Sequence, residues 1–391
     1  MIAQKIGEKV MSRQIKPRLV ISTVGTSLLT NQIDSQCEPD LASQLQDNAN
    51  LTEQEINPGS EIDNIIQDLK QRAEDKLNEA NTIEIRETSA ELNGIYGLYD
   101  DQLEKGKLDH HVLITTDTVQ GKITAEIVEE FLRERRISVE VYTPAKLSTA
   151  NTQDFNQGID NLLDWIHKRV KEDKEKNYEI YFNLVGGFKA LQGCMNTFGM
   201  FYADKIIYIF EGAKSNLITI PRLPITVDYS RLTDHVPTLA LLNADTGLLP
   251  SKTENIPEAM IAEIDGKMIF SNWGQLIWNQ CKNDFLSKEL QDFPRISYKD
   301  TFRKDYKNIS EDKYKVDLQE KLAKVSGLLE ESNGDTAYLK SNGGLLYEVY
   351  QNQGDIAHFR ITEGIRVSCT ASGGVVTLRR YGKEPDVNKN P

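Results

Sequence analysis

The sequence is poor in the residues that most often hold metals or crosslink chains. It has four cysteines (Cys37, Cys194, Cys281 and Cys369) and five histidines in 391 residues. The cysteines are widely scattered, with neither the Cys-x-x-Cys spacing of a zinc site nor the density of a disulfide framework. Structural zinc modules and small disulfide-rich folds are therefore excluded, and we expect no metal and no cofactor.

Long apolar runs are also missing. The longest comparable stretch, around Ile206–Phe210, falls far short of the ~18 apolar residues that a membrane span needs. Residues 1–16 lack the continuous apolar core of a signal peptide. These features predict a cytoplasmic protein that contacts no membrane. A hydrophobic content of 39% and a charged content of 27% are ordinary for globular proteins and exclude wholesale disorder.

The net charge of −13 is unevenly distributed. Residues 295–391 carry 16 Lys and Arg against 14 Asp and Glu, whereas residues 1–294 carry 30 against 45. A polyanionic partner therefore fits better at the C-terminal part of the chain. The alternative, a module that is simply less acidic, explains the same small excess.

The first half of the chain alternates short β-branched runs with helical patterns. We expect strands at Arg18–Thr23, His111–Thr116, Ile137–Tyr142, Tyr178–Leu184 and Lys205–Glu211, and helices at Ile123–Arg135, Gly158–Lys174 and Lys189–Ala203. Such alternation predicts an α/β fold with a doubly wound parallel sheet of the Rossmann type. Between the first two strands, residues 30–59 are polar and predict a mobile loop or lid, and Ser60 caps a helix that follows.

The second half changes character. Residues 221–226 are expected as extended chain, and Glu263–Gln280 as a hairpin followed by an amphipathic helix. After Pro294 come a strand, two helices and a run of strands separated by glycine-rich turns, the pattern of a small α+β domain with an antiparallel sheet. We therefore divide the chain into a first domain at 1–232, a connector segment at 233–294 and a last domain at 295–391.

Three turns of the first domain directly follow strands and carry glycines or hydroxyls. They lie in Ser22–Leu29, Thr115–Lys122 and Asn183–Gly193. Glycine lets a backbone approach a ligand closely, and a helix N-terminus favours an anion, so these turns suit phosphate groups. Neither the GxGxxG nor the P-loop pattern is present. Each turn alone is more typical of an ordinary strand–helix connection, but three at one sheet edge favour a nucleotide site.

Five stretches in order make the first domain similar to a known family. They are STVGTSLL, TSAELNGIYGL, TTDTVQGK, NLVGGFKA and YIFEGAKSNLITIPRLPI, spread over residues 17–230. Together they resemble the CRISPR-associated Rossmann-fold (CARF) domain. The resemblance implies a homodimer that binds a cyclic oligoadenylate, expected to be cyclic tetra-adenylate, made by a type III CRISPR complex. The implied ligand-binding residues are Gly25, Thr26, Ser27, Thr116, Asp117, Thr118, Asn183, Gly186, Gly187, Phe188 and Lys189.

The expected output domain lacks the signatures of two common nucleases. No histidine has an arginine five to seven positions before it, which excludes the HEPN ribonuclease motif, and a PD-(D/E)xK nuclease is also poorly supported. The domain instead has a cationic set around a predicted sheet, with Arg366 expected on its open face. RNA cleavage without metal needs such cations to stabilise the dianionic transition state. A solvated, charged sheet face is the alternative.

The order of elements over residues 295–388 resembles the RelE/ParE toxin superfamily. The opening strand leads into a basic-aromatic helix, Leu-Lys precedes a glycine turn, and the strand with Arg366 leads into Gly-Gly-Val-Val. By this resemblance Arg366 corresponds to the central phosphate-binding arginine, with Arg360 as its competitor. The other implied catalytic residues are Lys340, Arg380, Tyr381, Lys383 and, as a base, His358. ParE relatives share the fold without ribonuclease activity.

The two domains together resemble the CARF–RelE fusions called CRISPR-associated messenger-RNA interferases. The resemblance implies a cyclic-oligoadenylate-activated endoribonuclease that cuts mRNA in the ribosomal A site and inhibits translation. Its implied partners are a second copy of the chain, the ribosome and mRNA, with no DNA. Two alternatives stay open: a ring nuclease that degrades the cyclic ligand in the first domain, and a non-enzymatic sensor whose ParE-like module binds a protein.

Overall fold

The chain divides into two compact units, with the boundary between Ile225 and Thr226. The computed structural model describes residues 16–34, 36–210, 216–351 and 353–391. Almost all of the leader examined for a signal peptide, and Glu211 at the end of an expected strand, lie outside these residues. Within the described ranges, no helix combines the length and the apolar character needed to cross a membrane.

The first unit is built on a six-stranded, mostly parallel sheet. Its strands are β1 (Arg18–Thr23), β2 (His110–Ile114), β3 (Ser138–Tyr142), β4 (Glu179–Asn183), β5 (Lys205–Ile209) and β6 (Leu217–Pro221). They follow the order β3-β2-β1-β4-β5-β6, and only β6 runs antiparallel to its neighbour. The expected doubly wound sheet is thus confirmed. The strand order reverses between β1 and β4, which is where such folds leave a crevice for ligands.

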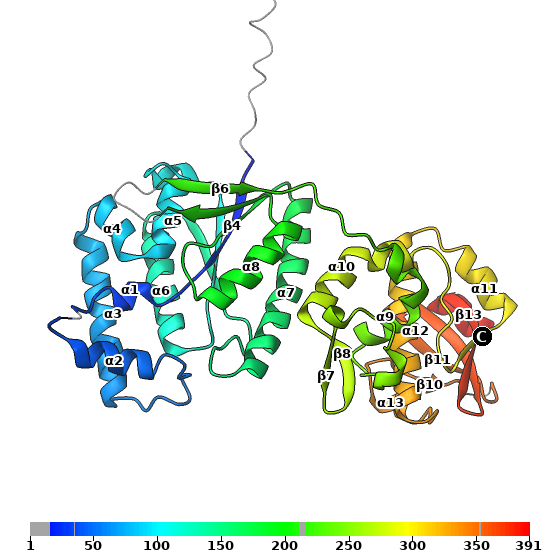
Figure 1. The fold of residues 1–391 in the computed structure, drawn as a ribbon. Coiled ribbons are helices and arrows are strands. Elements are labelled where there is room, and N and C mark those ends of the chain that lie inside the picture. Colours follow the sequence, from blue (N-terminus) through cyan, green and yellow to red (C-terminus); the bar gives the residue numbers. More distant parts are fainter. Residues whose placement is uncertain (1–15, 35, 211–215, 352) are drawn as a thin grey trace, which may run out of the picture. The chain divides into compact units, whose positions relative to one another are not determined.

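Helices cover both faces of this sheet (Figure 1). They are α1 (Ser27–Thr30), α2 (Pro39–Asp47), α3 (Glu61–Glu79), α4 (Thr82–Thr88), α5 (Ala90–Leu98), α6 (Val119–Glu134), α7 (Thr152–Glu175) and α8 (Lys189–Tyr202), with a 3-10 turn at Leu103–Gly106. Gly97 of α5 faces Ile209, whereas Gly199 of α8 faces Ile206. Ile206 and Ile209 point to opposite faces of β5 because successive side chains alternate.

The segment between β1 and α3 differs from its prediction. Residues 30–59 contain the helix α2, which begins at Pro39 and buries Leu45. Arg72 of α3 holds it through a hydrogen bond from Nη1 to Glu38 Oε1 at 3.0 Å. The cap of α3 is as expected, since Ser60 Oγ accepts a hydrogen bond from the Asp63 amide. The polar composition gave no sign of the short helix α2, which tertiary contacts stabilise.

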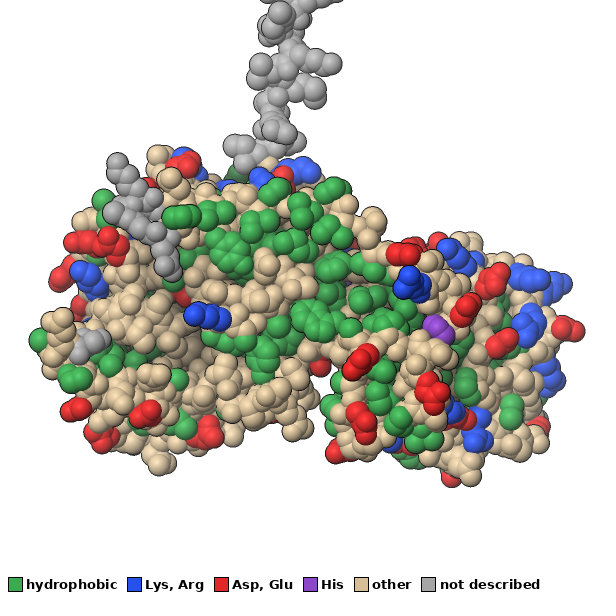
Figure 2. Space-filling model, viewed as in Figure 1, with side chains coloured by type: hydrophobic (Ala, Val, Ile, Leu, Met, Phe, Trp, Pro, Cys, Tyr) green, Lys and Arg blue, Asp and Glu red, His purple; other side chains and the backbone are tan. Residues whose placement is uncertain are grey.

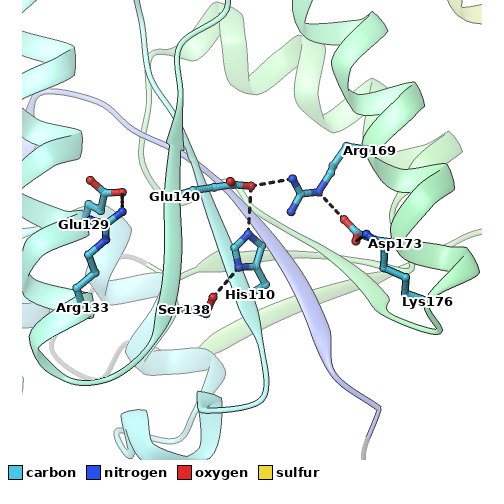
Figure 3. Close-up of polar contacts among 8 residues, drawn as sticks. All are labelled: His110, Glu129, Arg133, Ser138, Glu140, Arg169, Asp173 and Lys176. Atoms are coloured by element: carbon cyan, nitrogen blue, oxygen red, sulfur yellow. Dashed lines mark hydrogen bonds and ion pairs between the residues drawn. The ribbon is translucent and has the colours of Figure 1, made fainter.

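A polar network joins β2, β3 and α7 at the amino ends of the strands (Figure 3). His110 bridges Ser138 Oγ, 2.8 Å from Nδ1, and Glu140 Oε1, 3.1 Å from Nε2. Arg169 of α7 pairs with Glu140 at 2.8 Å and with Asp173 at 2.5 Å. These contacts fix the edge strand and its helix at the end opposite the strand–helix turns.

The second unit combines helices with a mixed five-stranded sheet. It contains α9 (Val236–Asn243), β7 (Ile261–Ile264), β8 (Lys267–Phe270), α10 (Asn272–Leu286), β9 (Ile296–Tyr298), α11 (Asp300–Lys307), α12 (Asp312–Glu331), α13 (Tyr338–Ser341), β10 (Glu348–Val349), β11 (Ala357–Thr362), β12 (Ile365–Ser372), β13 (Val375–Lys383) and α14 (Glu384–Lys389), with 3-10 turns at Ser230–His235, Pro250–Lys252 and Glu258–Met260. β10 to β13 form the expected antiparallel sheet. β9 joins its edge in parallel with β13.

The segment expected as a connector, residues 233–294, belongs to the core of this second unit. The expected hairpin and helix are present as β7, β8 and α10. Leu239, Trp278 and Cys281 are fully buried in one apolar cluster with Phe359 and Val367 of the sheet. The second unit is therefore larger than the 97-residue module that the sequence pattern isolated.

Candidate functional site

The turns after β1 and β4 pack directly against each other. A Cβ atom on Gly25 would lie 3.0 Å from the Gly187 amide nitrogen, and one on Gly187 would lie 2.9 Å from Thr23 Cβ. Gly187 has a φ of +93°, a conformation that side chains with a Cβ avoid. Thr23 Oγ1 donates a hydrogen bond to the Gly186 carbonyl at 2.5 Å. Glycine is thus required at both positions for this close approach.

An open pocket of about 470 Å³ lies at the carboxyl ends of β1, β2 and β4. Eight of the eleven residues implied to bind the cyclic ligand line it: Gly25, Thr26, Ser27, Thr116, Thr118, Gly186, Gly187 and Phe188. Thr30, Ala49, Ala90 and Thr149 line it from outside the turns. The structure therefore brings three sequence-distant turns into one concave site.

The pocket offers hydroxyls and backbone N–H groups rather than charged side chains. Among the described residues that line it, none is Lys, Arg, Asp or Glu. The N-cap of α8, Phe188, lines the pocket and makes no side-chain capping bond in the described structure, so the N-terminus of α8 begins at the pocket edge. Helix N-terminal amides with the helix dipole attract anions without a net positive charge.

Three of the implied ligand residues do not line the pocket. Asn183 is fully buried, and its Nδ2 donates to Ser22 Oγ and to the Glu91 carbonyl, both at 3.2 Å. Asp117 pairs with Lys122 at 2.9 Å. Lys189 is exposed at the start of α8, next to Phe188. Asn183 therefore holds the strand ends together from below, while Lys189 stands at the rim.

Glu91, a carboxylate beneath the two glycine turns, is a residue of the site that was not predicted from the sequence. Glu91 is fully buried, and it accepts hydrogen bonds from the Gly25 amide at 2.8 Å and from Ser89 Oγ at 2.9 Å. A Cβ on Gly186 would lie 2.0 Å from Glu91 Oε1. Glu91 belongs to the TSAELNGIYGL stretch, but its burial has no signal in the sequence because a helical glutamate is usually solvated.

The expected lid is anchored beside the pocket. The Val119 amide donates to the Leu51 carbonyl at 2.9 Å, and Gln120 Nε2 donates to the Leu45 carbonyl at 2.7 Å. Thr149 donates a hydrogen bond to Asn50. The segment after α2 thus connects to the start of α6, one of the helices whose N-terminus faces the site.

A second candidate site lies on one face of the sheet in the second unit. Arg360 of β11 is directly opposite Arg366 of β12, and His358 is opposite Ser368. Residues directly opposite each other share a face, so these four side chains form one group. Arg366 Nη2 pairs with Glu384 Oε1 at 2.6 Å. The structure therefore places both competing arginines and the candidate base together.

The expectation that Arg366 lies on an open sheet face is wrong. Only 7% of Arg366 is exposed, and His358 and Ser368 are buried as well. The covering element is α14, whose Val387 is 3% exposed and approaches Gly382 of β13. A two-residue repeat indicates which face a side chain takes, but not whether a later helix covers that face.

The electrostatic environment of His358 is set by burial and by nearby cations. Burial, and then the Arg366 charge, lower the pKa of His358, so its ring is neutral at pH 7. Its Nε2 lies 4.0 Å from Glu348, and its ring packs against Tyr350 with centroids 4.4 Å apart. A neutral imidazole beside two arginines is able to accept a proton.

Of the remaining implied catalytic residues, Arg380 is directly opposite Ser368 and so shares the face of Arg366, whereas the others lie elsewhere in the unit. Arg380 pairs with Asp305 of α11 at 2.7 Å. Tyr381 is opposite Val367, on the core-facing side of the sheet, and burial raises its pKa to about 12. Tyr381 and Lys383 line a pocket of about 700 Å³. Lys340 lies in the short helix α13 and not on the sheet.

A family comparison finds one match in the first unit. Residues 86–223 match the family model described as CRISPR-associated protein (Cas_APE2256). The matched stretch includes Glu91, the turn after β2 and the turn after β4. This match supports an association of the chain with CRISPR systems and a CRISPR-related role for it.

Proposed function

We propose that this chain is a CRISPR-associated sensor and effector. The first unit binds a cyclic oligoadenylate, with cyclic tetra-adenylate as the ring to test first. The second unit is a RelE-like, metal-independent endoribonuclease that cuts mRNA in the ribosomal A site when the ligand is bound. The proposal extends the CRISPR-associated match of residues 86–223 to a specific ligand and reaction.

The pocket at the β1–β4 reversal is the observation that carries the sensing proposal. Two glycine turns in contact, the hydroxyls of Thr26, Ser27 and Thr116, and the uncapped start of α8 all converge on it. Backbone amides and hydroxyls suit the phosphates of a ribonucleotide ring. Lys189 at the rim adds a charge that reaches toward a bound phosphate.

A homodimer suits a two-fold symmetric ring, because each copy presents the same surface across the axis. Apolar side chains gather on the face of the first unit around β6 (Figure 2). Phe210, Ile218, Leu223 and Ile225 are all exposed there, and Phe210 is 68% exposed. An exposed apolar group of this kind is typical of a protein interface, which supports association of two copies.

The proposed nuclease chemistry uses the residues on the sheet face. The RNA 2′-oxygen attacks the adjacent phosphorus, the bond to the 5′-oxygen breaks, and a 2′,3′-cyclic phosphate forms. His358 takes the 2′-hydroxyl proton, and Arg360 and Arg366 stabilise the added negative charge of the transition state. The departing 5′-oxygen takes a proton from water.

Two measurements on the whole chain test this proposal. Calorimetry with cyclic tetra-adenylate, followed by chromatography of the ligand, separates binding from ring cleavage. Incubation with a defined mRNA, with and without ribosomes, separates a ribosome-dependent nuclease from a binder. We expect binding without rapid ring cleavage, and mRNA cuts only when ligand and ribosomes are both present. Ring cleavage alone supports the ring-nuclease alternative, and binding without either cleavage supports the non-enzymatic sensor.

A further inference from the structure

The short helix α14 covers the sheet face that carries Arg366. Its first residue is fixed by a hydrogen bond from the Glu384 amide to the Gly364 carbonyl at 3.0 Å. Val387 packs onto β13, and Tyr350 Oη donates to Asn388 Oδ1 at 2.7 Å. These contacts place the helix over the group formed by His358, Arg366 and Ser368.

Beneath α14 lie three buried polar atoms that have no hydrogen-bond partner among the described residues. They are His358 Nδ1, Arg366 Nε and Ser368 Oγ. Each of these residues is at least nine-tenths buried. Buried polar groups are nearly always paired, because leaving them unpaired is costly. Three such atoms on neighbouring positions of β11 and β12 form a buried polar group with hydrogen-bonding capacity left for a ligand.

The chemistry of this group selects a phosphodiester as that ligand. Arg366 Nε and the Ser368 hydroxyl can each donate a hydrogen bond to a phosphate oxygen, and His358 Nδ1 can donate or accept one according to its tautomer. The guanidinium of Arg366 is instead paired with the Glu384 carboxylate. Carboxylate and phosphate oxygens bind a guanidinium in the same geometry. Glu384 therefore occupies the position that a phosphate would take.

We propose that α14 is an autoinhibitory cap on the ribonuclease site. Glu384 keeps Arg366 in an ion pair that an RNA phosphate must replace, and the site opens when α14 leaves the sheet. This inference rests on the proposed function, because it concerns regulation of the same site.

Few contacts hold α14 on the sheet. It has six residues, no side-chain capping bond in the described structure, and Val387 as its buried residue. A helix this short is marginal without its tertiary contacts. Its hold on the sheet thus depends on Glu384, Val387 and Asn388, and loss of one contact shifts the equilibrium toward the open form.

The test compares Glu384→Gln with Asp386→Asn in the full chain. Both substitutions remove one negative charge from α14, but Asp386 is exposed, whereas Glu384 pairs with Arg366. The probe is a fluorescent 2′-O-methyl RNA, which cannot be cleaved, titrated by anisotropy without cyclic ligand. We expect Glu384→Gln to bind about tenfold or more tightly than wild type, as for loss of a competing charged pair. Asp386→Asn should match wild type.

Two further variants keep the outcome clear. Val387→Ser should also raise RNA affinity and speed hydrogen exchange in residues 384–389, because it loosens the helix without altering charge. The double variant Arg366→Ala/Glu384→Gln should lose the gain. Equal RNA affinity in wild type, Glu384→Gln and Val387→Ser overturns the cap, even if ligand-activated mRNA cleavage is intact. A gain in RNA affinity without any mRNA cleavage supports the cap and contradicts the proposed nuclease.

Discussion

Replacing Gly187 by alanine tests the contact between the two glycine turns. At a φ of +93° a residue with a Cβ is strained, and the new Cβ would lie 2.9 Å from Thr23 Cβ. The backbone strain and the overlap together cost about 2–4 kcal/mol. The turn must move to relieve this cost, and its movement displaces Gly186 and Phe188, which line the pocket.

Gly193→Ala is the matched control, because it makes the same change of residue in a permissive place. Gly193 lies inside α8, and a Cβ there meets nothing within 4 Å. Alanine should stabilise this helix position by about 0.5–1 kcal/mol. The two variants are therefore expected to shift stability in opposite directions.

Hydrogen exchange of the β1 and β4 amides measures the stability of the first unit, and calorimetry measures affinity for cyclic tetra-adenylate. We expect faster exchange and at least a roughly tenfold weaker affinity for Gly187→Ala, since the cost exceeds 1.4 kcal/mol. Gly193→Ala should show slower or unchanged exchange and normal affinity. Wild-type exchange and affinity in Gly187→Ala would refute the packing of the turns as described.

Four further changes test other parts of the account. Glu91→Ala leaves the Gly25 amide and the Ser89 hydroxyl without their acceptor, so denaturant unfolding should show a loss of about 1–3 kcal/mol; an unchanged midpoint counts against a structural role. Lys189→Ala should weaken cyclic tetra-adenylate binding by about tenfold or more in calorimetry, without changing thermal stability, and normal affinity would remove Lys189 from the site. Arg366→Ala should slow mRNA cleavage about a hundredfold or more in a gel assay and also lower stability by about 1–3 kcal/mol, because the buried pair with half-exposed Glu384 is lost; full activity would exclude Arg366 from the chemistry. Burial lowers the pKa of His111 to about 3, so between about pH 3 and pH 6.5 the unfolded chain binds a proton at this residue and the folded chain does not. The free energy of unfolding should therefore decrease as the pH falls below about 6.5, by up to ~1.4 kcal/mol per pH unit. In His111→Asn this dependence on pH should be weaker.

The sheet of the first unit was predictable because its strands are buried on both faces. Leu19, Val20 and Ile21 are each 0% exposed, and such a continuous apolar run with β-branched residues has few alternatives to a central strand. The turns that follow were predictable for a related reason. A glycine after a buried strand indicates a close approach, and Gly25 and Gly187 do touch.

Other features depend on contacts that no local pattern encodes. The helix α2 buries only Leu45 and is held by Arg72, so its sequence has no clear apolar period. Glu91 is indistinguishable from a solvated helical glutamate until the fold places it under Gly25. The cover over Arg366 was missed because α14 has only Val387 as an apolar signal.

No local sequence pattern indicates that residues 233–294 belong to the second unit. Pro294 and the change from helices to strands suggested a new domain, whereas Trp278 and Cys281 share one core with the sheet. A core assembled from segments far apart in sequence has no compositional boundary. Burial of Trp278, at 0% exposure, is the feature that joins them.

Toeprinting of a defined mRNA in a translation extract tests the central claim most directly. The chain is added with and without cyclic tetra-adenylate, beside Arg366→Ala as the inactive control. The account predicts new mRNA ends at the A-site position of ribosomes, only with ligand and only for the wild-type chain. Unchanged mRNA in the presence of bound ligand, or the same cuts from Arg366→Ala, would contradict it.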